Sequence, residues 1–297
     1  MTNFPGDVAV FPYIPACVLR VSGPDAAIFL QGQFTNDLGK VKPGESVYGL
    51  WLDRRGRVIA DSQVIRSADG AQFWVASLAS PAQVVAHRLG EFIIADDVVI
   101  EDETAGWRGL ALLGAGSGAW LAGAARPGLV FPGRRDSGES WEWVYPAGEA
   151  EAVGTATSGA RTADPAAVER RRIASGIPSI PADIGPGDLP NEGGLETQAI
   201  SYSKGCYLGQ EVMARLKSTG RVRRMLVRVR GGGAPPATPA ALWRGDRREG
   251  ELRTAVADGS GAAFAGLALV SVAAGREGGG LSLAAGAPPS IEISLNS

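Results

Sequence analysis

Residues 204–217 read KGCYLGQEVMARLK, and this stretch determines how the rest of the chain is interpreted. Gly205 and Gly209 permit a tight backbone on either side of Cys206, so we predict that the cysteine lies in a turn. Apolar residues then recur every four positions, which predicts a helix with one buried face. Gly220 is placed to end that helix. The segment therefore predicts a turn that carries a cysteine and leads directly into a helix.

The predicted turn gives Cys206 an environment that favours the thiolate form. The cysteine precedes a helix N-terminus, whose free N–H groups and dipole stabilise negative charge, and Lys204 is two residues away. A thiolate binds metals, attacks disulfides and reacts with electrophiles. Free cysteines are also common as small, buried, apolar residues. The spacing alone leaves both interpretations of Cys206 open.

The composition is typical of a globular protein with more than one domain. The chain has 297 residues, of which 45% are hydrophobic, and this length predicts roughly two or three domains. The net charge of −2 gives no general attraction to nucleic acid or to anionic membranes, so we expect neither as a partner. We find no signal-peptide pattern and no apolar stretch with the length of a membrane span. We therefore expect a cytoplasmic protein.

Few residues in the chain could hold a metal permanently. Cys17 and Cys206 are the two cysteines, too few for a disulfide framework or for an iron–sulfur cluster held by this chain alone. The single histidine, His87, argues against zinc hydrolases and Ser-His-Asp chemistry. Cys17 lies in an apolar stretch, so we expect it in a core. We expect no stably bound metal, with Cys206 available as a transient ligand.

Hydrophobic patterns along the chain predict an α+β fold. In the first half, strand-like segments alternate with helical ones, and residues 47–53 and 57–65 read as a hairpin. Residues 165–175 read as a helix that Asp164 caps. From Arg223 onward, short strands separated by glycine-rich turns predict a small antiparallel barrel.

The octapeptide KGCYLGQE, at residues 204–211, resembles the signature K-G-C-Y-x-G-Q-E of the YgfZ family, relatives of the glycine cleavage T-protein. Shorter segments that also resemble this family's pattern extend the likeness over most of the chain. They are GIP at 176–178, LPNE at 189–192, AIS at 199–201, ARLKSTGRVRR at 214–224, LQGQFTNDL at 30–38 and GRVIAD at 56–61.

This resemblance implies a fold and a domain organisation. The expected fold is an α+β three-domain ring of the glycine cleavage T-protein type, with a C-terminal antiparallel β-barrel. A discontinuous folate-binding core is expected from residues 1–48 and 155–218, and it would carry the octapeptide. An inserted ferredoxin-like α+β domain would occupy residues 49–154, and the barrel residues 219–297.

The resemblance also implies a function. We expect a folate-binding accessory protein, rather than a turnover enzyme, that acts in the assembly or repair of iron–sulfur enzymes. Tetrahydrofolate or a derivative would lie in a central channel, and a cysteine would be the functional residue. The expected partners are folate and iron–sulfur client enzymes, and we expect the protein to be a monomer.

The family's functional residues map onto individual positions of this chain. Cys206 and Lys204 are the expected catalytic residues. The other motif residues at the site are Gly205, Tyr207, Gly209, Gln210 and Glu211. The residues expected to contact folate are Asn36, Asp37, Asp61, Glu192 and Arg221.

Two positions depart from what the T-protein relatives carry. Ala174 stands where those relatives often have a glutamate that contacts the pterin. The catalytic T-protein has paired acids where this chain has Ala60 and Asp61. Because one acid is missing, a folate-dependent aminomethyltransferase or other one-carbon transferase is the alternative function rather than the first choice.

Two further patterns point to other functions. Residues 114–119, GAGSGA, match a dinucleotide-binding fingerprint, but no parallel βαβ units surround them and a strand-to-helix turn explains them better. A run of basic residues could bind an anion, or RNA if the protein is an RNA-binding or tRNA-modification accessory module. The run consists of Arg215, Lys217, Arg221, Arg223, Arg224, Arg228 and Arg230.

Overall fold

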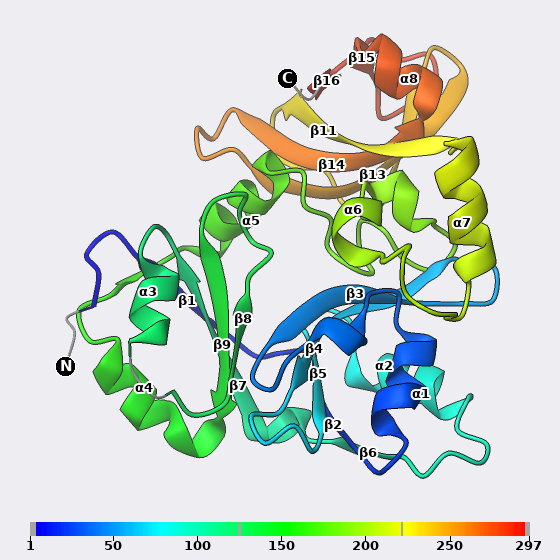
Figure 1. Ribbon diagram of the computed structural model, residues 1–297. Coiled ribbons are helices and arrows are strands. Elements are labelled where there is room, and N and C mark those ends of the chain that lie inside the picture. The colour runs from blue at the N-terminus through cyan, green and yellow to red at the C-terminus, as the bar shows by residue number, and fades with distance from the viewer. Residues whose placement is uncertain (1–3, 124–125, 221, 295–297) are drawn as a thin grey trace.

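The structure, a computed structural model, describes residues 4–123, 126–220 and 222–294. Three β-sheets with their helices are arranged around the centre of the molecule (Figure 1). Helices and mostly antiparallel strands are mixed throughout, so the predicted α+β class is confirmed.

The first sheet, called the β3 sheet here, has the strand order β3-β4-β5-β2-β6 and is antiparallel throughout. Helices α1 and α2 pack against it, and Leu30, Trp51 and Val85 lie in the shared core. The elements are β2 (Cys17–Ser22), α1 (Ala26–Gln33), η1 (Leu38–Lys40), β3 (Ser46–Leu52), β4 (Val58–Arg66), β5 (Phe73–Ser77), α2 (Ala82–Gly90) and β6 (Val99–Asp102).

The second sheet, called the β7 sheet, has the order β10-β1-β7-β9-β8. Its first strand comes from the N-terminus and pairs in parallel with β10, whereas the other pairs are antiparallel. The elements are β1 (Ala9–Tyr13), η2 (Thr104–Gly106), β7 (Trp107–Leu113), α3 (Ser117–Ala122), β8 (Leu129–Pro132), β9 (Ser140–Pro146), η3 (Ala147–Glu149), α4 (Ala150–Ala156) and β10 (Arg161–Thr162).

The third sheet forms the C-terminal barrel, with the order β12-β13-β14-β11-β16-β15. A bridge between Trp243 and Ser282 brings its two edges together, so the six antiparallel strands form a nearly closed barrel, as predicted. The elements are β11 (Arg224–Gly232), β12 (Ala240–Arg244), β13 (Arg247–Ala257), β14 (Ala263–Ser271), α8 (Val272–Glu277), β15 (Gly280–Leu281) and β16 (Ile291–Ser294).

Four helical segments connect the β7 sheet to the barrel: α5 (Pro165–Ala174), η4 (Pro190–Gly193), α6 (Glu196–Ala199) and α7 (Gln210–Thr219). The helix predicted after Asp164 is confirmed, because the Asp164 carboxylate accepts from the N–H of Ala167 and Pro165 is the first helical residue. The helix predicted after the octapeptide is also confirmed. Gly209 and Gly220, both at positive φ, flank it.

The predicted domain boundaries at residues 48/49 and 154/155 do not follow the sheets. Strand β3 runs across residue 49, α4 runs across residue 154, and the segment 49–154 contributes strands to both the β3 sheet and the β7 sheet. The cause is long-range pairing of β1 with β7 and β10, which no local pattern encodes. The barrel, by contrast, lies entirely after residue 219.

The fold also shows how residues 114–119 are used. Residues 114–119 connect the end of β7 to the start of α3, so the strand-to-helix turn is confirmed. Within the described ranges, none of the helices combines the length and the apolar character that a membrane crossing requires.

Candidate functional site

The two cysteines lie in opposite environments. Cys17 is fully buried in the core of the β3 sheet, as predicted, and this burial raises the pKa of its thiol. Cys206 is exposed, in the loop between α6 and α7. Its interpretation as a small buried apolar residue is therefore wrong, and its thiol is open to a partner molecule.

Lys204 is used to anchor the loop that carries Cys206. Its Nζ donates to the carbonyl oxygens of Gln31, Phe34 and Asn36 at 2.7, 2.6 and 2.9 Å. These carbonyls belong to the end of α1 and the residues after it, where carbonyls lack helical partners. Every ammonium proton is thus engaged by backbone, and none is left for the Cys206 thiol. The catalytic role predicted for Lys204 finds no free proton in this geometry.

Burial also affects the ionisation of Lys204. The side chain is largely enclosed, and this desolvation lowers the pKa of its ammonium to about 8, although Asp37 opposes the shift. The ring of Tyr207, itself buried, lies 5.2 Å from Nζ. Lys204 and Tyr207 therefore act as buried supports on either side of the exposed cysteine.

Gly209 fixes the other end of the loop by close backbone contact. It adopts a φ of +85°, and a Cβ at this position would lie 2.9 Å from the carbonyl oxygen of Asp53 and 3.1 Å from Cα of Gly56. These two residues belong to the turn between β3 and β4. Gly205, in contrast, has open space where its Cβ would be. The octapeptide is therefore held between α1 and this hairpin, and Cys206 and Gly205 face outward.

The remaining motif residues lie at the start of α7. Gln210 is partly buried and Glu211 is exposed in the first helical turn, as predicted from sequence. The backbone N–H of Gln210 bonds to the carbonyl of Tyr207. This contact makes the loop and the helix continuous, so a displacement of one would move the other.

Asn36 joins the octapeptide to strand β3. Its Nδ2 donates to the carbonyl oxygens of Tyr48 and Gln198 at 2.9 and 3.1 Å, and its own carbonyl accepts from Lys204. Asp37 accepts from the side chain of Gln31, and this bond is the largest cause of the lowered pKa of its carboxyl. Both residues were predicted to contact folate, and in the structure their side chains bond to neighbouring parts of the chain.

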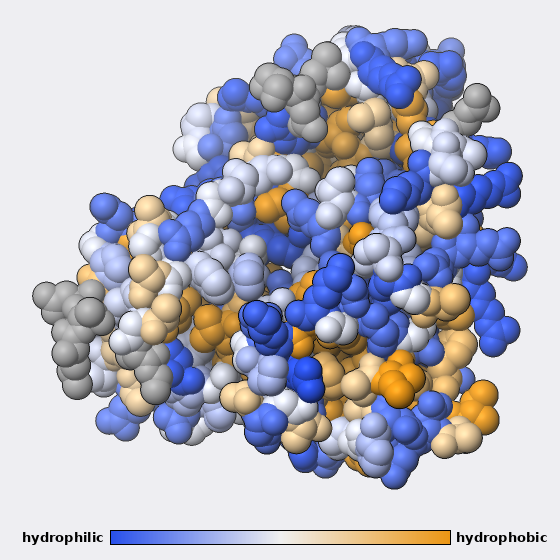
Figure 2. All heavy atoms as spheres, in the orientation of Figure 1, coloured by the Kyte–Doolittle hydropathy of each residue, from blue (hydrophilic) through white to orange (hydrophobic). Residues whose placement is uncertain are grey.

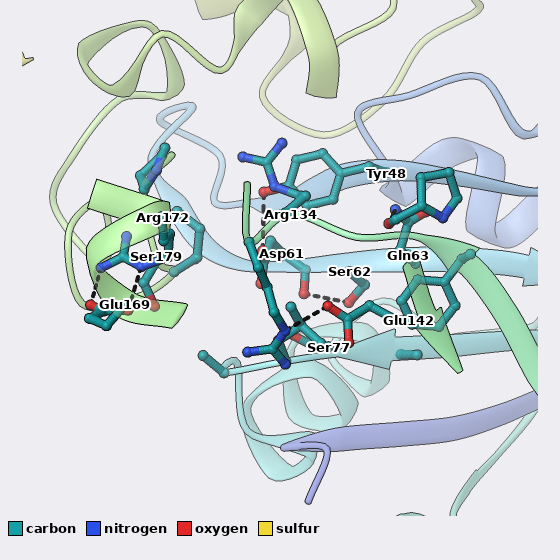
Figure 3. Close-up of a pocket in the computed structure, with 18 residues that line it drawn as sticks. Tyr48, Asp61, Ser62, Gln63, Ser77, Arg134, Glu142, Glu169, Arg172 and Ser179 are labelled. Carbon is teal, nitrogen blue, oxygen red and sulfur yellow. Dashed lines mark hydrogen bonds and ion pairs between the residues drawn. The ribbon is translucent and has the colours of Figure 1, made fainter. Parts of the chain in front are cut away.

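A pocket of about 150 Å³ lies between the β3 sheet, the β8–β9 hairpin and the chain around α5 (Figure 3). Asp61 of β4 points into it. Its carboxylate accepts from the hydroxyls of Tyr48, Ser77 and Ser80 at 3.1, 3.0 and 2.7 Å. Burial is the main effect on this group and raises the pKa of Asp61, although the hydrogen bonds oppose the shift.

Arg134 covers one side of this pocket. Its guanidinium lies 3.9 Å from the centre of the Tyr48 ring and donates to Oε1 of Gln198 at 2.6 Å. It comes from the loop between β8 and β9, whereas Tyr48 belongs to β3 and Gln198 to α6. The pocket is therefore enclosed by segments that are far apart in the sequence.

Two buried acceptors in the pocket were missed by the sequence analysis. Glu142 of β9 is fully buried, and its Oε1 accepts from Nε of Arg135 at 2.7 Å. Its Oε2, and Oε1 of Gln63 on β4, have no hydrogen-bond partner among the residues that the structure describes. The sequence did contain a signal. Glu142 is an acid inside the largely apolar strand 140–146, and acids are rarely buried in such strands unless they are paired.

The other predicted folate contacts lie elsewhere. Glu192 is buried, pairs with Arg224 at 2.7 Å, and accepts from the N–H of Leu189 at 2.9 Å. It does not line the pocket around Asp61. Arg221 lies outside the described residues. Asp61 is therefore the member of the predicted folate set that the structure places in the pocket.

The basic run divides into two groups. Arg224, Arg228 and Arg230 have partners within the protein, namely Glu192 and Asp188, the carbonyl of Ala174, and Asp258. Arg215, Lys217 and Arg223 are exposed, on or next to α7. Figure 2, in the orientation of Figure 1, shows mainly hydrophilic residues in the region of α7. Among the described members of the run, Arg224, Arg228 and Arg230 are therefore already bonded within the protein.

The two departures from the T-protein pattern can now be located. Ala174 is exposed at the end of α5 and does not line the pocket. Ala60 is fully buried in the core of the β3 sheet with Trp51, and it is not a pocket residue either. An acid at position 60 would point into this core and not into the pocket. The alanine at this position therefore takes no functional group away from the pocket. The structure therefore gives no support to the argument from Ala60 against the transferase alternative.

Metal-binding groups do not converge within the described part of the chain. In residues 4–123, 126–220 and 222–294, His, Cys, Asp and Glu side chains form no group of three or more that could hold an ion. His87 is exposed on α2 beside Glu91. A metal bound at Cys206 would therefore need further ligands from a partner or a small molecule.

The arrangement of three sheets defines the class of protein. The chain matches a crystal structure of the glycine cleavage system aminomethyltransferase T from Bartonella henselae with a TM-score of 0.78 at 22% sequence identity, covering 97% of this chain and 85% of that one. A family model described as the GCVT N-terminal domain matches residues 7–127. The protein therefore has the fold of the glycine cleavage T-protein, as predicted.

Sequence relatives narrow this class to a family. The "tRNA-modifying protein YgfZ" of Edwardsiella ictaluri (strain 93-146) is 32% identical over 235 residues, which cover 72% of this chain and 68% of that protein. The chain belongs to the YgfZ family. The human "Iron-sulfur cluster assembly factor IBA57, mitochondrial" is 29% identical over 232 residues, covering 72% of this chain and 64% of that protein.

Proposed function

We propose that this protein is a folate-binding accessory factor for the assembly or repair of iron–sulfur enzymes, and that Cys206 is its functional thiol. The observation that carries the proposal is the exposure of Cys206 on a loop that Lys204 and Gly209 fix to separate parts of the fold. Membership of the YgfZ family and similarity to an iron–sulfur cluster assembly factor supply the function class. The cysteine would act as a transient ligand for a metal or cluster, or as a thiol that reacts with a partner.

The residues of the loop support this role of Cys206 by holding it still. Lys204 and Gly209 attach the two ends of the loop to separate elements, and the thiol lies between them. A thiolate there would face solvent and could join ligands from a client protein, because the described part of this chain has no group of three or more His, Cys, Asp or Glu side chains that could hold the metal by itself. The cargo would therefore be shared between two molecules rather than enclosed in one.

The pocket around Asp61 is the proposed folate site. Its aromatic ring at Tyr48 and its open acceptors suit a flat heterocycle with N–H donors. The volume of about 150 Å³ lies below the roughly 300–1,000 Å³ of pockets that enclose a whole drug-sized ligand. The pterin ring would therefore enter, and the glutamate tail would remain outside. Bound tetrahydrofolate would supply a carrier of one-carbon units.

The pocket and the cysteine loop are connected through Asn36. Tyr48 donates its hydroxyl to Asp61 in the pocket, and its carbonyl accepts from Asn36. The carbonyl of Asn36 in turn accepts from Lys204, which anchors the loop of Cys206. A ligand that moved Tyr48 would therefore act on the cysteine loop through two hydrogen bonds.

Calorimetric titration with tetrahydrofolate under reducing conditions tests the folate part of the proposal. We expect saturable binding at one site, and weaker binding to the Asp61→Ala variant. Absence of binding at high ligand concentration would reject folate as the ligand. Cys206 would then remain as a thiol for partner proteins.

Complementation tests the cysteine part. Cys206→Ala should fail to restore iron–sulfur enzyme activities in a bacterial strain that lacks its own YgfZ protein and that the unaltered chain complements. Ser203→Ala, at an exposed position in the same loop, is the matched control and should restore them. Full activity with Cys206→Ala would remove Cys206 from the centre of the mechanism.

A further inference from the structure

Strand β6 is an edge of the β3 sheet. It ends the strand order β3-β4-β5-β2-β6 and pairs with β2 alone among the strands that the structure describes. The N–H of Glu103 donates to the carbonyl oxygen of Val18 at 3.0 Å, and the strand register continues from this pair. Because bonded and non-bonded pairs alternate in an antiparallel ladder, Ile100 and Asp102 direct their N–H and carbonyl groups away from β2. The backbone of β6 can therefore pair with a further strand.

Apolar side chains are exposed around this edge. Ile94, in the loop before β6, is 90% exposed, Ile28 on α1 is 78% exposed, and Val99 on β6 itself is 49% exposed. The loop is joined to the start of α1, because the N–H of Asp25 donates to the carbonyl oxygen of Asp97 at 3.3 Å. Figure 1 draws α1 and β6 close together at the lower right, and Figure 2 shows hydrophobic residues in the same region. An exposed apolar area beside an unpaired strand edge is typical of a binding surface.

The charges at this edge are all negative. Residues 91–103, EFIIADDVVIEDE, contain six acids and no base, in a chain whose net charge is −2. Arg20 on the neighbouring strand pairs with Glu101 and Glu103 at 2.6 and 2.7 Å. Glu101 nevertheless stays exposed, and so does Asp102. The edge therefore carries a negative potential that favours a basic partner and disfavours an acidic one.

We infer that the edge of β6 is a docking site for an extended segment of a partner protein in which two basic residues adjoin two apolar ones. The order follows from β6, where Val99 and Ile100 precede Glu101 and Asp102. An antiparallel partner strand would read basic-basic-apolar-apolar from its N-terminus, because opposite charges and apolar pairs stabilise neighbouring strands. Its backbone would supply affinity, and its side chains would supply specificity. This surface goes beyond the proposed function, since it requires neither folate nor Cys206.

A second copy of this chain fits the edge poorly. Residues 99–102 contain no base, so two paired β6 strands would place acids opposite acids or apolar residues in any register. Acids on an edge strand also deter pairing in general, and this protective role is the simplest alternative. A purely protective edge is not expected to expose Ile94 and Val99 beside its charges. A basic partner segment accounts for both the charges and the apolar residues.

The experiment is a fluorescence-anisotropy titration of two labelled peptides with the whole protein. The peptides have the same composition and charge, and both are flanked by serine. One has the core Lys-Lys-Val-Val, and the other has the core Lys-Val-Lys-Val. We expect the first peptide to bind about fivefold more tightly, because the second places lysine opposite Ile100 and valine opposite Glu101.

Variants of the edge locate the bound peptide. Asp102→Asn and Val99→Ser should each weaken binding of the Lys-Lys-Val-Val peptide about threefold, because each removes one cross-strand pair. Both positions are exposed, so the fold should be retained. Glu292→Gln is the matched control, because it changes an exposed acid on β16, a strand with neighbours on both sides. It should bind the peptide as tightly as the unaltered protein.

Four results would overturn the inference. Equal affinities for the two peptides would mean that the acids attract basic molecules in general, and absence of binding would leave them a protective role. An affinity that Asp102→Asn and Val99→Ser do not change would place the peptide elsewhere on the protein. A dimer in sedimentation velocity that Val99→Ser dissolves would assign the edge to a second copy. None of these results changes what is expected of folate or of Cys206.

Discussion

The loop of Cys206 and the pocket of Asp61 both rest on strand β3, but they are built in opposite ways. In the loop, the Lys204 ammonium is bonded to backbone carbonyls, and the Cys206 thiol faces solvent. In the pocket, charged and amide side chains are buried and some acceptors stay open. The loop presents a reactive atom to a large partner, whereas the pocket is shaped for a small molecule.

This contrast explains why the two regions differ so much as sequence signals. A loop that must display one atom needs particular residues at consecutive positions, so its signature is contiguous. A pocket collects single residues from β3, β4, β9 and α5, so its signature is scattered. A signature motif can therefore consist mainly of structural supports, of which Lys204 and Gly209 are examples.

The largest expected effect concerns the accessibility of the two thiols. Iodoacetamide should alkylate Cys206 in the native protein, whereas Cys17 is buried and should react at least about 1,000-fold more slowly, because it must wait for unfolding. Mass spectrometry of timed samples gives both rates, and in denaturant the two rates should converge. Comparable native rates would show that the core around Cys17 is open.

The second effect tests the backbone contact at one end of the loop. Gly209→Ala should lower the free energy of unfolding by about 2–4 kcal/mol, because alanine is strained at positive φ and its Cβ would meet the hairpin backbone. Gly205→Ala is the matched control and should change stability by less than about 0.5 kcal/mol. Urea denaturation measures both. Equal losses would mean that the hairpin contact does not fix the loop.

The third effect tests the anchor at the other end. Lys204→Met should lower the free energy of unfolding by about 2–3 kcal/mol, because three carbonyls lose a charged donor. Lys42→Met, at an exposed position, is the control and should be within about 0.5 kcal/mol of the unaltered protein. The contrary result, an unchanged midpoint for Lys204→Met in urea denaturation, would show that the anchor is dispensable.

The smallest effect concerns the pH dependence of the pocket. Burial raises the pKa of Asp61 above its ordinary value of 3.8, so the folded protein keeps this proton while the unfolded chain loses it. Stability contributed by Asp61 therefore falls as pH rises from 3.8 to the raised folded value, and stays constant above it. Asp61→Asn removes this titration. Its stability relative to the unaltered protein should rise across that window, measured by urea denaturation at a series of pH values, and a constant difference would contradict the buried charge.

Local chemistry made a large part of the fold predictable from sequence. The helix after Gly209, the helix that Asp164 caps and the barrel of short strands all depend on periodicity and turn residues within a few positions. The family resemblance added the T-protein arrangement, which the comparison of folds confirms. Strand β3 runs across the boundary expected at residue 49, and only the pairing of distant strands determines where the sheets divide.

By itself, the sequence determined that this is an α+β protein of the YgfZ family whose cysteine lies in a turn before a helix. The tertiary structure alone decided that Cys206 is exposed, that Lys204 is an anchor, and that Asp61 shares a pocket with Glu142. The physical reason is distance along the chain. Lys204 bonds to a carbonyl 173 positions away, and no local pattern of residues specifies which polar groups meet at such separations.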